Sequence, residues 1–166
     1  TRNEPVLDAV TPQPVFHAYP DALPADVRVC TYSLDELFAE KTRALYERTR
    51  PRDLYDVVFI LENRAGAINL DRARDLLRRE CGVKKLSPPT SAELFERIRN
   101  SGELRSEWAN MLRHQLPELP PIEVYIDRLP VLLSWIDGPA LTPTVTLASA
   151  PVGRGEELVA AGGLHY

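Results

Sequence analysis

Residues 32–56 read YSLDELFAEKTRALYERTRPRDLYD and carry the clearest structural signals in the chain. Ser33 precedes an apolar repeat of helical period, and Glu36 lies three residues further on. This is the spacing of a capping box, in which a serine hydroxyl and a glutamate carboxylate each bind a free amide at the start of a helix. The stretch therefore predicts a first helix over 34–48.

A second helix is expected after a very short turn. Thr49 and Arg50 break the helical pattern, and Pro51 suits the first position of a new helix because its missing amide is not needed there. Apolar residues then recur with helical spacing, and we expect this helix to end near Asn63, before Gly66. Two helices joined in this way form an antiparallel hairpin.

The predicted hairpin brings charged side chains toward an apolar seam. Lys41 falls within the apolar stripe of the first helix, whereas Arg43 and Arg48 are expected to reach solvent. A buried cation is costly unless it is paired. Asp53 and Asp56 are three residues apart and share a helix face. We therefore expect the Lys41 ammonium to lie within salt-bridge reach of Asp53 or Asp56.

This cluster has a catalytic and a structural interpretation, and the residue types leave both open. Two carboxylates and a lysine at a partly buried edge shift one another's protonation, which suits acid–base or metal chemistry. A structural ion pair, or a lysine whose ammonium extends to water, is the alternative. Three arginines in the turn suit phosphate binding but are also usual in a solvated turn. The candidate catalytic residues are Lys41, Asp53 and Asp56, and the candidate substrate-binding residues are Arg48, Arg50 and Arg52.

The flanking segments predict an α+β fold that is predominantly α-helical, with short N-terminal strands followed by a helical bundle. Prolines exclude a long helix in the first 26 residues, and short strands are expected at 15–17 and 27–32. The further helices expected are 70–80 with Gly82 as C-cap, 90–100 with a Thr90/Glu93 capping box, 104–116, and 123–136 kinked or split at Pro130. The predicted organisation is residues 1–32, a helical domain over 33–137, and a loosely structured tail over 138–166 with a candidate strand at 145–147.

Composition narrows the class of protein. The 166 residues carry a net charge of -4, so any contact with nucleic acid must come from a local patch. Cys30 and Cys81 have neither a disulfide-framework nor a zinc spacing, and we predict reduced thiols. No apolar run approaches the roughly 20 residues that cross a bilayer, and we expect no signal peptide. We expect a cytoplasmic protein that does not contact a membrane.

A basic stretch lies along the third expected helix and continues past the end of that helix. Such a stretch is usually a solvated face, and the alternative is a contact with RNA phosphates. Its members are Arg72, Arg74, Arg78, Arg79, Lys84 and Lys85. Trp108 and Trp135 fall in helical apolar stripes, and we expect both in the core.

The stretch 32–56 resembles the central signature of the AbiEii/AbiGii toxin family. The shared pattern is Ser-Leu-x-Glu-Leu, then Glu-Lys, Ala-Leu and Arg, then Pro-Arg-Asp-Leu-Tyr-Asp. The resemblance implies a nucleotidyltransferase-fold toxin of a type IV toxin–antitoxin or phage-defence system, some of whose relatives modify the acceptor end of tRNA. It also implies that Lys41 is the family's motif lysine and Asp53 its motif aspartate, with Arg52 and Asp56 in the same motif.

The sequence departs from the family pattern at the metal site. The family's catalytic core begins with a Gly-Ser pair and an Asp-x-Asp, and this sequence contains neither. The resemblance therefore implies the C-terminal portion of such a toxin, with 1–32 as a remnant of core strands, or a degenerate relative. The partners implied are the missing N-terminal nucleotidyltransferase core, a cognate antitoxin and tRNA. Mg²⁺ and a nucleoside triphosphate are implied for the intact protein, and neither is expected for this chain alone. The alternative is a non-catalytic module that binds an antitoxin or RNA.

Overall fold

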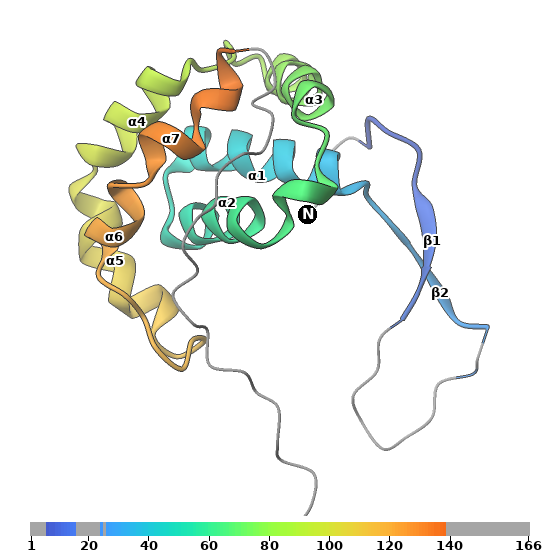
Figure 1. The fold of residues 1–166 in the computed structure, drawn as a ribbon, viewed down its shortest axis with the longest axis horizontal. Coiled ribbons are helices and arrows are strands. Elements are labelled where there is room, and N and C mark those ends of the chain that lie inside the picture. The colour runs from blue at the N-terminus through green and yellow to red at the C-terminus, as the bar shows by residue number, and fades with distance from the viewer. Residues whose placement is uncertain (1–5, 16–23, 25, 139–166) are drawn as a thin grey trace, which may run out of the picture.

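The computed structural model describes residues 6–15, 24 and 26–138, and shows a helical body from which a two-stranded ribbon projects (Figure 1). The elements, with η for short 3-10 helices, are β1 (Thr11–Pro14), β2 (Arg28–Thr31), α1 (Leu34–Arg48), α2 (Pro51–Arg64), η1 (Ala65–Ala67), α3 (Leu70–Val83), α4 (Ser91–Arg99), α5 (Gly102–Leu112), α6 (Ile122–Ile126), α7 (Leu129–Leu132) and η2 (Ser134–Ile136). The predicted α+β class with a predominance of helix is confirmed. Apart from Gly138, the tail and the candidate strand within it lie outside the described residues.

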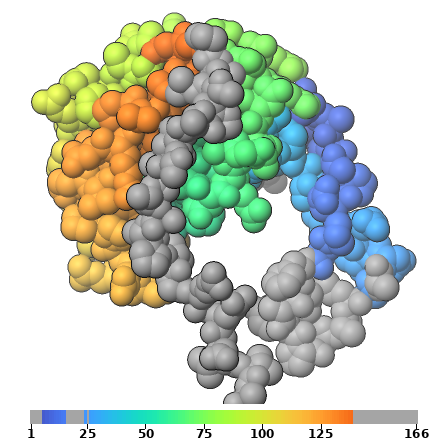
Figure 2. Space-filling view, in the orientation of Figure 1, coloured from blue at the N-terminus to red at the C-terminus, as the bar shows by residue number. Residues whose placement is uncertain are grey.

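The β1–β2 ribbon is antiparallel, with Thr11 opposite Thr31, and all its residues are exposed (Figure 2). The strand predicted at 27–32 is confirmed as β2. The strand predicted at 15–17 is not found at Val15, and residues 16 and 17 lie outside the described part. The partner strand is β1 instead, which its two prolines concealed. Proline is tolerated there because β1 is an edge strand, where a missing amide need not break the pairing.

The core forms around α1, which packs between α2 and α3. Phe38 of α1 and Leu54 of α2 have no solvent exposure, and Leu77 of α3 is almost fully buried. Trp135 of η2 closes the core, with its ring centroid 4.9 Å from that of Phe38. Trp135 and Trp108 are both buried, as predicted, and the two cysteines are free thiols.

The helical hairpin is confirmed, but the capping box at its start is only half formed. The Ser33 hydroxyl accepts from the Glu36 amide at 3.1 Å, as predicted. The Glu36 carboxylate is not turned back to Ser33. It accepts from the backbone amides of Leu7 and Asp8, at 2.5 and 3.2 Å. The glutamate therefore ties the segment before β1 to α1, because those two amides have no helix or sheet partner of their own.

The end of α3 differs from the prediction that Gly82 is the C-cap. The helix continues through Gly82 to Val83, and Lys85 takes the left-handed conformation with φ 56°. The amide of Lys85 binds the carbonyl of Gly82 at 3.0 Å, and the amide of Leu86 binds that of Cys81 at 2.9 Å. These two bonds form a Schellman motif, which ends the helix without needing glycine at the left-handed position.

The last helices also differ in their bounds. The helix expected at 104–116 starts at Gly102, because the Ser101 hydroxyl accepts from the Leu104 amide at 3.1 Å, and it ends at Leu112. The helix expected at 123–136 is split, as predicted. The break precedes Pro130, which occupies the first turn of α7, where its missing amide is harmless.

The Thr90/Glu93 capping box is confirmed and gives a test of this helix start. The Thr90 hydroxyl accepts from the Glu93 amide at 3.2 Å, and the Glu93 carboxylate accepts from the Thr90 amide at 2.8 Å. Thr90→Ala should lower the free energy of unfolding by about 1 kcal/mol, because one amide of the first turn loses its partner. Thr90→Ser should leave it nearly unchanged. Urea denaturation measures both, and equal midpoints for wild type and Thr90→Ala would contradict the prediction.

Candidate functional site

The turn between α1 and α2 contains a strained residue. Thr49 has φ 50° and ψ 51°, and the left-handed region is unfavourable for a β-branched side chain. Arg97 of α4 clamps the turn, since its Nε donates to the Thr49 hydroxyl and its Nη2 to the Glu47 carbonyl, both at 3.1 Å. Backbone strain that the surrounding structure enforces is common at functional sites. Here it lies between two of the candidate arginines, Arg48 and Arg50.

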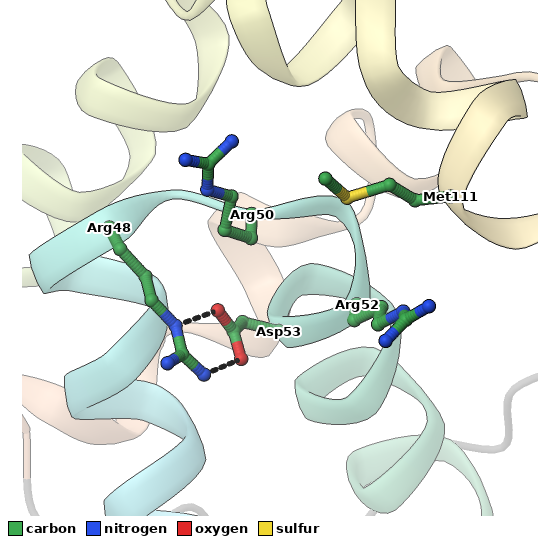
Figure 3. A pocket seen from close by; sticks show the side chains of 5 residues that line it. All are labelled: Arg48, Arg50, Arg52, Asp53 and Met111. Atoms are coloured by element: carbon green, nitrogen blue, oxygen red, sulfur yellow. Dashed lines mark hydrogen bonds and ion pairs between the residues drawn. The ribbon is translucent and has the colours of Figure 1, made fainter.

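Arg48 and Asp53 close this turn with a two-pronged ion pair (Figure 3). Arg48 Nε lies 2.7 Å from Asp53 Oδ2, and Arg48 Nη2 lies 2.8 Å from Oδ1. The Asp53 carboxylate is buried and raises the pKa of Arg48, chiefly through this hydrogen bond. Asp53 therefore binds Arg48 rather than Lys41, and its orientation is fixed from both oxygens.

Lys41 pairs with Asp56, as the predicted salt bridge required. Lys41 Nζ lies 2.9 Å from Asp56 Oδ2, and the two side chains are 29% and 36% exposed. Lys41 is thus at the edge of the buried face of α1 and not within it, contrary to our expectation. Partial burial lowers the pKa of Lys41, but the hydrogen bond to Asp56 and the nearby carboxylates outweigh it and raise that pKa. Lys41 is therefore a permanent cation near neutral pH, suited to neutralising an anion rather than to accepting a proton.

The three arginines of the turn line one pocket of about 400 Å³ together with Asp53 and with Met111 of α5 (Figure 3). Arg50 forms an ion pair with Glu103 of α5. Arg52 points away from Asp53 and, among the residues that the structure describes, has no carboxylate partner. The pocket thus has a free guanidinium at its rim and two anchored ones, which suits a phosphate group.

Comparison with known protein families identifies the chain through this region. The profile of the nucleotidyl transferase AbiEii toxins of type IV toxin–antitoxin systems matches residues 4–135. The chain belongs to the AbiEii toxin family. The match includes the ribbon, the hairpin with Lys41 and Asp53, and the helices after it. Comparisons with curated proteins and with solved structures gave no significant match.

The described AbiEii residues do not fit a magnesium ion. Mg²⁺ is bound through carboxylate oxygens and waters. Asp53 is bound by Arg48 from both oxygens, and Asp56 is bound by Lys41. Within the described ranges no group of three or more His, Cys, Asp or Glu side chains is placed to hold a metal. The same ranges contain no helix that is long and apolar enough to span a bilayer.

Two groups of charged residues outside the turn are accounted for structurally. The prediction that Arg43 reaches solvent is wrong: its side chain is 2% exposed and pairs with Glu40, Glu47 and Glu80. The only sequence signal for this burial was a glutamate three residues before Arg43 and another four residues after it.

The basic stretch on α3 forms ion pairs, with Arg72, Arg74 and Arg78 each bound to an aspartate. The solvated interpretation of that stretch is therefore favoured over RNA binding.

Proposed function

We propose that the chain is the C-terminal part of an AbiEii nucleotidyltransferase toxin, which in its intact form transfers a nucleotide to an RNA acceptor such as tRNA in the cytoplasm. The observation that carries this proposal is the pocket at the α1–α2 turn. It combines a fixed Arg48–Asp53 pair with the free guanidinium of Arg52, and a family motif occupies the same turn. Phosphate groups are shared by a nucleoside triphosphate and an RNA end, and both are substrates of such a transfer.

Each candidate residue then has a role that its contacts support. Lys41 neutralises phosphate charge, and Asp56 orients its ammonium from 2.9 Å. Asp53 holds Arg48 so that the turn keeps its shape, and Arg50 and Arg52 contact phosphate oxygens from the pocket. In this proposal Mg²⁺ and the triphosphate are held mainly by an N-terminal core with the Gly-Ser and Asp-x-Asp motifs, because the aspartates of this turn are already paired.

The isolated 166-residue chain should show no nucleotidyltransferase turnover. It lacks an Asp-x-Asp, and without those carboxylates no metal is held at the transferring phosphate. The assay incubates the purified chain with Mg²⁺, each labelled nucleoside triphosphate and total tRNA, beside an intact protein that includes the core. Label on tRNA from the isolated chain would show that transfer does not need the Asp-x-Asp carboxylates of an N-terminal core. An intact protein that is folded but labels no RNA would refute the proposed function.

The second candidate is a non-catalytic module that binds an antitoxin or RNA. Its support is that both aspartates of the turn are committed to cations and that the metal motifs are absent. The family is one of toxin–antitoxin systems, so a cognate antitoxin is a general expectation. The two candidates separate in the intact protein: RNA or antitoxin binding without any nucleotide transfer, in a folded sample, would favour the binding module.

A further inference from the structure

A row of aromatic rings leads from the core to the outward face of α2. Trp108 of α5 is buried, and its ring centroid lies 4.8 Å from that of Tyr125 of α6. Tyr125 lies 6.2 Å from Tyr55 of α2, and Tyr55 stacks on Phe59 with centroids 5.8 Å apart and ring planes 20° apart. The row ends at Phe59, which is 47% exposed.

The inner rings are held in place, so the exposed ring of Phe59 has a fixed position before any ligand binds. The Trp108 indole donates to the Pro120 carbonyl at 3.0 Å, which fixes the base of the row. Burial and the neighbouring Asp56 charge raise the pKa of Tyr55. About half of Phe59 is open to solvent, although its ring stacks on Tyr55.

A cation continues the same line. Arg52, Tyr55 and Phe59 are spaced three and four residues apart, so their side chains follow one face of α2. Arg52 also belongs to the pocket at the turn. The carboxylate of Asp56, beside this line, is paired with Lys41 at 2.9 Å. We call the line of Arg52, Tyr55 and Phe59 the α2 ridge.

We propose that the α2 ridge binds a single-stranded RNA segment, with a base stacked on Phe59 and a phosphate on Arg52. A cation beside an exposed ring offers one contact for a phosphate and one for a neighbouring base of an unpaired strand, because every base has a face that can stack. An apolar protein segment would cover Phe59 but would leave the guanidinium of Arg52 unused. The inference rests on the proposed function, since it names the surface that holds the unpaired end of the RNA acceptor beside the pocket.

The test measures binding by the full 166-residue chain and needs no catalysis. The probe is a fluorescently labelled single-stranded oligoadenylate of about ten nucleotides, and the readout is anisotropy. Phe59→Ala should weaken binding by about 5- to 100-fold, because a stacked base is lost. Phe59→Trp should retain binding. The matched control is Tyr32→Ala, which removes a 45% exposed ring outside α2 and should leave the affinity unchanged.

A second variant tests the phosphate contact separately. Arg52→Gln should weaken binding and reduce the slope of log affinity against log salt by about 0.7, the value for one phosphate on a single strand. Circular dichroism would check that each variant is folded, which is the expected result because both side chains are exposed.

Several outcomes would overturn the inference. They are unchanged affinity in folded Phe59→Ala, equally tight binding of a duplex of the same length, and no binding of the probe while a cognate antitoxin covers Phe59. The proposed function can fail independently. If wild type binds the probe and Phe59→Ala does not, but the intact protein transfers no nucleotide, the ridge stands and the transferase proposal falls. If the intact protein transfers nucleotide and Phe59→Ala leaves the KM for RNA unchanged, the ridge falls alone.

Discussion

Lys41→Met should abolish the toxicity of the intact protein while leaving it folded. Methionine fills a similar volume without the charge that the proposed role requires. The Lys41–Asp56 pair is about one-third exposed on each side, and such pairs contribute about 0–1 kcal/mol to stability. Loss of this bridge is therefore too small to unfold the protein. Growth of bacterial cells after induction measures toxicity, and thermal melting of the purified variant measures folding.

A matched control removes an ion pair that has no proposed role. Arg78→Met breaks the exposed Arg78–Asp75 pair on α3, and we expect full toxicity from it. A folded and fully toxic Lys41→Met variant would eliminate the catalytic role and leave Lys41 as a structural bridge. Loss of toxicity in both variants would show that the assay reports stability and not the chemistry of the turn.

The hairpin could be predicted because its signals are local. A serine cap before residue 34 and Pro51 at the first position of α2 fix both helix starts within a few residues of sequence. The pairing of Lys41 with Asp56 also followed from helical spacing across an antiparallel hairpin. The partner of Asp53 did not, because Arg48 and Asp53 meet across a turn with Thr49 in the left-handed conformation, and this turn is bound by Arg97, 48 residues away.

The missed positions share a dependence on distant elements. Arg43 is buried because α3 packs over that face of α1 and places Glu80 beside it, 37 residues further along the chain. Phe59 fits the apolar character of α2, and nothing in the helical pattern distinguishes an exposed ring from a core one. Its exposure depends on how the other helices pack around α2, which helical spacing does not reveal. β1 was missed because proline argues against a strand unless the strand is known to lie at an edge.

Arg43→Met should destabilise the protein more than any other single charge substitution in the helical hairpin, by about 3–5 kcal/mol of unfolding free energy. Arg43 is 2% exposed, and its Nε lies 3.6 Å from Oε2 of Glu80, which is 1% exposed. Glu40 and Glu47 share the same guanidinium. Removing it leaves three carboxylates close together, one of them in the core, where an uncompensated charge is poorly solvated.

The double variant Arg43→Met with Glu80→Met separates charge burial from packing. Replacing a whole buried ion pair with apolar side chains of similar volume is often neutral, so the double variant should recover most of the lost stability. Urea denaturation of wild type, both single variants and the double variant forms a complete cycle, and its coupling energy should be about 2 kcal/mol or more. Additive losses would mean that Arg43 stabilises α1 and α3 through its packed side chain and not through its charge. An Arg43→Met variant as stable as wild type would contradict the buried cluster. Glu80 is 1% exposed, so water could not solvate its carboxylate once the guanidinium is removed.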